Sequence, residues 1–115
     1  MTRGTCILGS AEYNVLKTLH EIITENGDSW QNQILRTYCM RQGNVDKHEI
    51  LECARNHTTT FRKVVDILLM SGILGVKKYG NLTVYYFIAQ MNLENLIMMY
   101  IQKKEELYGD GVVNE

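Results

Sequence analysis

Residues 57–88 read HTTTFRKVVDILLMSGILGVKKYGNLTVYYFI, and the hydrophobic period changes within this stretch. From Phe61 onward the apolar residues recur at the three- and four-residue spacing of a helix that packs one face against a core. Two β-branched and aromatic segments follow, at 73–78 and 82–88, with a short break at 79–81. This break contains a glycine and an asparagine, which tolerate the positive φ of a tight turn. The stretch therefore predicts a helix that leads into a β-hairpin.

Four more helices are predicted, three before this stretch and one after it. A residue suited to capping a helix N-terminus precedes each periodic run, and Asp46 and Glu49 have the spacing of a capping box. Glycines follow the first two runs and are typical helix stops. The predicted helices span 10–26 with Ser10 as N-cap, 28–42 with Asp28 as N-cap, 46–56, and 92–107 with Asn92 as N-cap, and the helix of the opening stretch starts among residues 58–60.

One apolar stripe on each of the first four predicted helices is expected to face the core. The chain has 115 residues, of which 45% are hydrophobic and 22% charged, the size and composition of one globular domain. We expect this domain to span 1–108 and the tail 109–115 to be disordered. The predicted core residues are Val15, Leu16, Leu19, Ile22 and Ile23; Trp30, Ile34, Leu35, Tyr38 and Cys39; Ile50, Leu51 and Ala54; and Phe61, Val64, Val65, Leu68 and Leu69.

The hydrophobic residues do not gather into a targeting or membrane segment. The first residues, MTRGTCILGSAEYN, lack the apolar run of a signal peptide. No window approaches the roughly 18 apolar residues of a membrane span. We therefore expect a cytoplasmic protein that does not act at a membrane.

The basic residues gather in the middle of the chain, although the net charge is only −1. Residues 36–78 contain eight basic and four acidic side chains, a local charge of +4. The remainder contains four basic and nine acidic side chains, a charge of −5. A basic segment between acidic ends indicates a surface for a polyanion such as nucleic acid.

The three cysteines, Cys6, Cys39 and Cys53, are an odd number and do not suggest a secreted disulfide scaffold. We expect them to be free thiols that behave as small hydrophobes, although the sequence leaves their redox state open. A Cys39–Cys53 bridge is one alternative. Zinc is another, because Cys53 and His57 lie four residues apart with Cys39 and His48 nearby. No CxxC or HxxxH pair supports zinc, so no metal or cofactor is expected.

Within the predicted order of four helices, a hairpin and a last helix, helices two to four and the hairpin resemble the winged helix-turn-helix family, which implies a mainly α (α+β) fold. The resemblance covers residues 29–89 and rests on element order and spacing. The segment GNV at 43–45 lies where this family often places a one-residue strand, and SGIL at 71–74 resembles its helix-to-wing junction. The flanking helices 10–26 and 92–107 look like the dimerising arms of small bacterial, archaeal, viral or plasmid-borne regulators.

This resemblance implies binding of double-stranded DNA. The fourth helix would enter the major groove, and the hairpin would reach the minor groove or the backbone. Basic and hydroxyl side chains in those places can contact phosphates and base edges. Each also has an ordinary explanation as a solvated helix face or as lysines that protect a strand edge. The predicted DNA contacts are Thr58, Thr59, Arg62 and Lys63 on the helix, Lys47 at the start of the third helix, and Lys77, Lys78 and Tyr79 at the hairpin.

A homodimer is expected because methionines leave the last helix apolar over more than one face. A two-fold dimer would place two recognition helices on one face of the DNA. The predicted interface residues are Leu16, Leu19 and Ile23 on the first helix, and Leu93, Leu96, Ile97, Tyr100 and Ile101 on the last.

The sequence thus predicts a DNA-binding homodimer associated with the nucleoid, either a transcriptional regulator or a plasmid partition protein that binds a centromere. A winged-helix module that binds proteins is the alternative of another class. An enzyme is not expected, because no GxSxG, P-loop or HExxH motif occurs. Base stacking of RNA on Tyr85, Tyr86 and Phe87 is less favoured than packing, since alternation sends Tyr86 to the opposite face from the other two.

Overall fold

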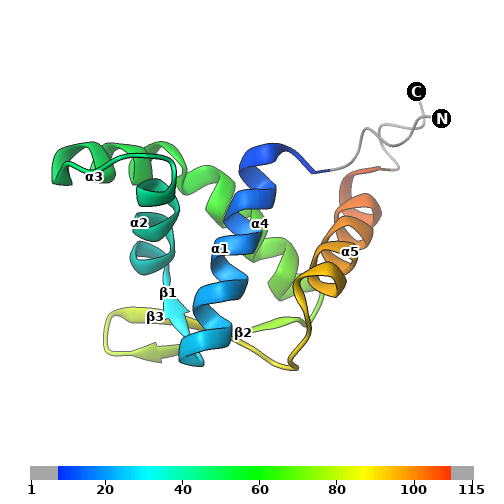
Figure 1. Cartoon of the computed structure of the whole chain (residues 1–115). Coiled ribbons are helices and arrows are strands. Elements are labelled where there is room, and N and C mark those ends of the chain that lie inside the picture. Colours follow the sequence, from blue (N-terminus) through cyan, green and yellow to red (C-terminus); the bar gives the residue numbers. More distant parts are fainter. Residues whose placement is uncertain (1–7, 110–115) are drawn as a thin grey trace.

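The computed structural model describes residues 8–109 as an α+β fold of five helices and a small three-stranded antiparallel sheet (Figure 1). No helix in this part of the chain is long and apolar enough to cross a membrane. Cys6 and the predicted tail after Gly109 lie outside the described residues. The elements are α1 (Ser10–Asn26), β1 (Ser29–Trp30), α2 (Gln31–Arg41), α3 (Lys47–Asn56), α4 (Thr58–Met70), β2 (Leu74–Tyr79), β3 (Leu82–Phe87), α5 (Leu93–Lys104) and a π-helical turn, η2 (Glu105–Gly109).

The capping residues place most helix ends where the sequence predicts them. Asn92 caps α5, because its side-chain Oδ1 accepts from the backbone N–H of Asn95 at 2.8 Å. Asp46 is the N-cap of α3, and its N–H donates to the Glu49 carboxylate. The N-cap of α1 is Gly9 rather than the predicted Ser10. The last helix also ends earlier than predicted, at 104, and continues as the π-helical turn η2 to 109.

The start of α2 differs from the prediction. Asp28 is not its N-cap, because Ser29 and Trp30 form the strand β1, which pairs antiparallel with β3 opposite Tyr85 and Val84. The short strand therefore precedes α2, and the described structure has no strand at 43–45. Backbone pairing with a distant strand outweighs the local capping preference, because it satisfies hydrogen bonds of both chain segments.

The predicted hairpin is confirmed. β2 and β3 pair from Leu74 opposite Phe87 to Tyr79 opposite Leu82, and the strand order is β1-β3-β2. Of the two turn residues, Gly80 has a positive φ of 63°, whereas Asn81 does not adopt one.

Alternation along β3 separates its aromatic residues as predicted. Tyr85 packs on Phe61, and Phe87 lies beside His20, so both face the helices. Tyr86 lies on the other face, opposite Gly75. Its ring lies so close to Gly75 that a Cβ at that position would overlap it.

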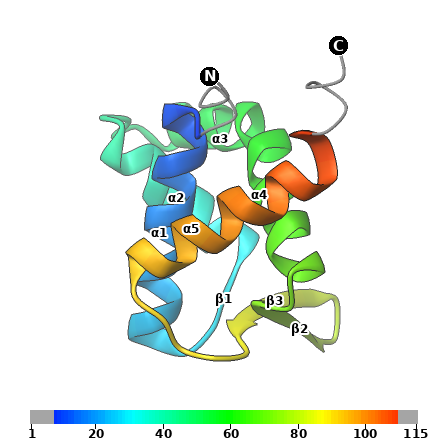
Figure 2. The same cartoon turned by 90° about the vertical axis from the view of Figure 1, so that its right-hand side faces the viewer.

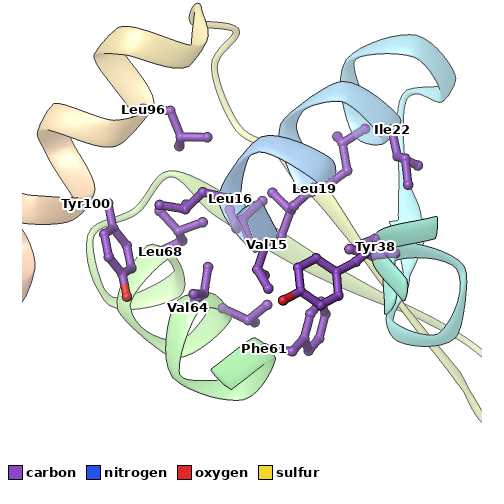
Figure 3. Packing of buried hydrophobic residues seen from close by; sticks show 14 of the residues in the cluster. Val15, Leu16, Leu19, Ile22, Tyr38, Phe61, Val64, Leu68, Leu96 and Tyr100 are labelled. Carbon is purple, nitrogen blue, oxygen red and sulfur yellow. The ribbon is translucent and has the colours of Figure 1, made fainter. Parts of the chain in front are cut away.

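The core lies between α1, α2, α4 and α5 (Figure 3). Most of the predicted core residues are buried there, together with Ile67, which the sequence analysis did not select. The prediction of burial is wrong for two residues: Trp30 is 38% exposed and Leu51 is 44% exposed. The predicted positions Ile50, Ala54 and Leu69 are half-buried.

Helix α3 buries none of its residues. It is joined to α2 by a disulfide between Cys39 and Cys53. The expectation of free thiols is therefore wrong for these two cysteines. Cys39 is fully buried in the core, and Cys53 of α3 is half-buried against it.

Helix α5 is attached by the core and by a buried carboxylate. Leu96 and Tyr100 are fully buried. The carboxylate of Glu12 on α1 accepts from the Tyr100 hydroxyl at 2.6 Å and from Nζ of Lys104 at 2.9 and 3.0 Å. Burial would raise the pKa of Glu12, but the hydrogen bonds from Tyr100 and Lys104 outweigh it and lower this pKa. The ion pair with Glu12 thus accounts for a lysine on the side of α5 that faces α1.

Most of the predicted dimer interface is not on the surface of the molecule. The carboxylate network and the core pack α5 directly on α1 and α4, so the chain itself covers one face of each terminal helix. The half-buried residues of the predicted set are Leu93, Ile97 and Ile101, and those enclosed in the core of the single chain are Leu16, Leu19, Ile23, Leu96 and Tyr100.

Candidate nucleic-acid interface

Helix α4 and the β2–β3 hairpin lie along the same side of the molecule, opposite α1 and α2 (Figure 2). Local structure produces this arrangement. Gly72 has a φ of 78° and ends α4, which leads at once into β2. Because β3 also pairs with β1, the hairpin is fixed close to the start of α2.

An open groove of about 510 Å³ separates the hairpin from α4 and from the start of α2. Polar side chains contribute from all three elements, and apolar side chains form part of the wall. The groove is lined by Trp30, Gln31, Asn32, Arg62, Val65, Asp66, Leu69, Asn81, Leu82, Thr83 and Tyr85.

The two predicted basic residues of α4 face different parts of the molecule. Arg62 is exposed and lines the groove together with Asp66, one turn further along the helix. Lys63 is also exposed but its Nζ lies 3.8 Å from Oε2 of Glu12 on α1, away from the groove. Only Arg62 therefore brings a positive charge to the hairpin side of α4.

Tyr85 forms a neutral part of the groove wall. Its ring packs edge-on against Phe61, with centroids 6.1 Å apart. Burial raises the pKa of Tyr85, the charge of Asp66 raises it further, and Arg62 opposes this change. The Tyr85 hydroxyl thus keeps its proton at neutral pH and remains a hydrogen-bond donor.

Strand alternation also separates the two hairpin lysines. Lys78 pairs opposite Thr83, a residue of the groove, so it projects on the groove side of the hairpin. Lys77 projects on the other side, where its Nζ lies 4.9 Å from the centroid of the Tyr86 ring. Tyr79 is exposed at the end of β2, beside the turn.

The remaining predicted contacts lie outside the groove. Thr58 uses its hydroxyl to donate to the backbone carbonyl of Ala54 at 3.0 Å, so it joins α3 to α4. Thr59 is exposed in the first turn of α4. Lys47 lines a different groove, of about 440 Å³, together with Arg36 and with exposed apolar residues of α2 and α3.

The sequence analysis did not select the amide side chains of the groove. Gln31 and Asn32 begin α2, and Asn81 belongs to the hairpin turn. Each amide offers both donors and an acceptor, and the first backbone N–H groups of a helix have no partner within it. Two consecutive amide residues at a helix start were a usable signal, but the predicted start at Asp28 placed them inside the helix.

The groove thus combines one guanidinium, several amides and one carboxylate, and Lys78 projects on the same side of the hairpin. Arginine and amide side chains form the bidentate hydrogen bonds that recognise bases and phosphates. The Asp66 carboxylate repels a phosphate but accepts from a cytosine amino group.

A separate group of potential metal ligands lies at the junction of α2 and α3. It comprises Cys39, Cys53 and His57, whose ligand atoms all lie within 4.8 Å of one another.

No protein-family model, curated protein or solved structure matches this chain.

Proposed function

We propose that this chain is a winged helix-turn-helix protein that binds double-stranded DNA in a sequence-specific manner. The observation that supports it most directly is the groove that α4, the hairpin and the start of α2 share on one side of the molecule. The element order and the sheet order β1-β3-β2 are consistent with this family. In this proposal α4 is the recognition helix and the β2–β3 hairpin is the wing.

The recognition helix would present Thr59, Arg62 and Asp66 to base edges in the major groove. The wing would contact the backbone through Lys78 and Tyr79. Lys78 is the cation of this wing contact, and neutralising one phosphate contributes about −0.9 per subunit to the slope of log affinity against log salt concentration.

A homodimer would double these contacts, and we propose that α5 forms its interface on a revised surface. Met98 and Met99 are 65% and 41% exposed, next to the half-buried Ile97 and Ile101. We expect Met98→Asp with Met99→Asp to halve the mass measured by light scattering. Met40→Asp, a matched change of an exposed methionine on α2, should leave the mass unchanged. A dimer that survives the double change would place the interface elsewhere.

The proposed biological role is transcriptional regulation, and plasmid partition through a centromere requires the same groove contacts. The two roles differ in the arrangement of binding sites rather than in the protein surface. A single inverted repeat near a promoter supports regulation, whereas an array of repeats supports partition.

Selection from a random duplex library at two salt concentrations tests the DNA proposal. We expect one sequence family to be enriched, with an affinity that falls steeply as salt increases. Failure to enrich any sequence, together with weak binding at low salt, would contradict the proposal.

Matched variants test the groove itself. Arg62→Ala should reduce affinity for the selected site about five- to 150-fold, because it removes a contact worth about 1–3 kcal/mol. Lys63→Ala, the neighbour that faces Glu12, should reduce it much less. Lys78→Ala should likewise weaken binding more than Lys77→Ala, and equal losses within both pairs would contradict the assignment of the groove.

A protein-binding module is the second candidate. Asp66 in the groove disfavours phosphate, and the exposed apolar side chains of Trp30 and Leu82 line the same groove. Absence of any enriched DNA sequence, together with an intact fold, would favour this candidate.

A further inference from the structure

The junction of α2 and α3 carries three side chains with the chemistry of a zinc site. Cys39 belongs to α2, while Cys53 and His57 lie four residues apart and so share one side of α3 and its C-cap. Their ligand atoms all lie within 4.8 Å of one another. Thiolate and imidazole are the ligands that Zn²⁺ prefers in proteins.

The distance between the imidazole and one sulfur fits a shared metal ion. Zn–S and Zn–N bonds of about 2.3 and 2.05 Å at a tetrahedral angle put a sulfur and a nitrogen ligand about 3.6 Å apart. Sγ of Cys53 lies 3.7 Å from Nδ1 of His57. Two thiolates on the same ion would lie about 3.8 Å apart, so they must separate once they are no longer bonded to each other.

The surroundings provide access for an ion. A pocket of about 400 Å³ reaches Cys53 and His57 from solvent, and its wall includes the carboxylates of Glu49 and Glu52. Cys39 is fully buried, whereas the other two ligands are half-buried. A water molecule in this pocket would complete four-fold coordination.

The histidine must change its present hydrogen bond to coordinate an ion. Nδ1 of His57 now lies 2.9 Å from the carbonyl oxygen of Cys53. Coordination through Nδ1 requires the tautomer with its proton on Nε2 and releases this carbonyl. The ring packs edge-on against Tyr38, with centroids 4.9 Å apart, which fixes its general position.

We propose that reduction of the Cys39–Cys53 disulfide creates a binding site for Zn²⁺ formed by these two sulfurs and Nδ1 of His57. Disulfide and metal are then mutually exclusive ways of joining α3 to α2. In the first step a dithiol reductant breaks the S–S bond, becomes a disulfide itself and leaves two protonated thiols. In the second step Zn²⁺ binds both sulfurs and releases their two protons, with no further electron transfer.

This site matters for the fold because α3 has no buried residue. Without a disulfide or a metal, only half-buried side chains and the Thr58 hydrogen bond would hold α3 in place. The inference does not depend on the proposed DNA binding.

Titration with Co²⁺, a coloured probe for tetrahedral zinc sites, tests the proposal. The full chain carries Cys6→Ser, so that Cys39 and Cys53 are the only thiols, and is reduced with a dithiol that is then removed without air. We expect one Co²⁺ per chain, with thiolate charge-transfer bands that Zn²⁺ abolishes by displacement. The oxidised chain should show none of these bands.

Two histidine variants, one inside and one outside this pocket, provide the matched comparison. His57→Ala should weaken Co²⁺ binding at least tenfold, whereas His20→Ala, on α1 and outside the pocket, should leave it within twofold. Equal weakening by both variants would overturn the assignment of His57.

A thiol-protection experiment tests whether the reduced chain binds the ion while it remains folded. Zn²⁺ should slow maleimide modification of both thiols in the reduced chain but not in His57→Ala, while circular dichroism reports an unchanged helix content. A folded reduced chain that binds no Co²⁺ would overturn the proposal. Binding by a chain that has lost its helices would overturn it as well.

Discussion

Helices α3 and α5 lie at opposite ends of the molecule and are attached to the same body in different ways (Figure 1). α3 buries no residue and is bonded to α2 through Cys39 and Cys53. α5 buries Leu96 and Tyr100, and its Lys104 forms an ion pair with Glu12. Stability of the first attachment depends on redox conditions, and that of the second depends on pH.

The comparison shows that an amphipathic pattern does not ensure burial. Both helices carry apolar residues at helical spacing, but α5 buries Leu96 and Tyr100 completely, whereas Ile50, Cys53 and Ala54 of α3 are only half-buried against the core. A covalent bond can add to such partial packing, because it removes conformational freedom from the unfolded chain.

The largest difference is expected for two matched leucine truncations. Leu96→Ala on α5 removes a fully buried side chain and should lower the free energy of unfolding by about 4 kcal/mol. Leu51→Ala on α3 removes a side chain that is 44% exposed and should change it by about 0.5 kcal/mol or less. Urea denaturation measures both values. Similar losses at the two positions would mean that α3 is packed after all.

Reduction of the disulfide should have the next largest effect. Cys39 and Cys53 are separated by 14 residues, and closing a loop of this size contributes up to about 3 kcal/mol. We expect amide hydrogen exchange to show a loss of protection in α3 while α5 keeps its protection.

The double variant Cys39→Ser with Cys53→Ser is the control without reductant. It should reproduce the loss of protection in α3. Uniform loss of protection in both helices would contradict the idea of two separate attachments.

Low pH should weaken the attachment of α5 to the rest of the molecule. Because the pKa of Glu12 is lowered in the folded protein, its ionised form stabilises the fold above the ordinary value of 4.5. This contribution is lost as the pH falls from 4.5 through the lowered pKa of the folded protein. We expect α5 to lose exchange protection in this range before α3 does.

The variant Glu12→Gln distinguishes the contribution of this carboxylate to acid sensitivity from those of the other acidic groups. The substitution leaves Lys104 without its partner and should cost about 2 kcal/mol at neutral pH. It should also flatten the dependence of stability on pH below 4.5. An unchanged pH dependence in this variant would assign the acid sensitivity to another group.

The smallest effect is expected at the junction of α3 and α4. Thr58→Val removes the hydrogen bond from the Thr58 hydroxyl to the Ala54 carbonyl and should cost about 1 kcal/mol. Thr59→Val, the exposed neighbour, is the matched control. Hydrogen exchange should show slightly lower protection of α3 in Thr58→Val than in Thr59→Val, and equal protection would mean that this hydrogen bond does not help to hold α3.

Local signals in the sequence were sufficient for most of the fold. Asn92, Asp46 and the glycine-containing turn at 79–81 identify their elements through short-range chemistry. The strand Ser29–Trp30 was missed because its partner lies in β3, more than fifty positions along the chain. No local pattern distinguishes such a strand from the first turn of a helix.

The candidate site was predictable only in part, for a similar reason. Helical periodicity indicates that Arg62 and Lys63 are exposed, but it does not reveal that Glu12 lies beside Lys63. Alternation assigns Lys77 and Lys78 to opposite faces, yet only the register opposite Thr83 shows which of them projects on the groove side of the hairpin. Contacts between distant segments determine which of the exposed charges act together.

The contact between Gly75 and Tyr86 has a consequence for how this chain can diverge. Because a Cβ at position 75 would overlap the Tyr86 ring, a substitution of Gly75 requires this half-buried ring to move. Replacement of Tyr86 by a smaller residue would remove that requirement. Among descendants of this sequence, a change at one position should therefore accompany a change at the other, and Lys77, which lies over the same ring, would lose its support.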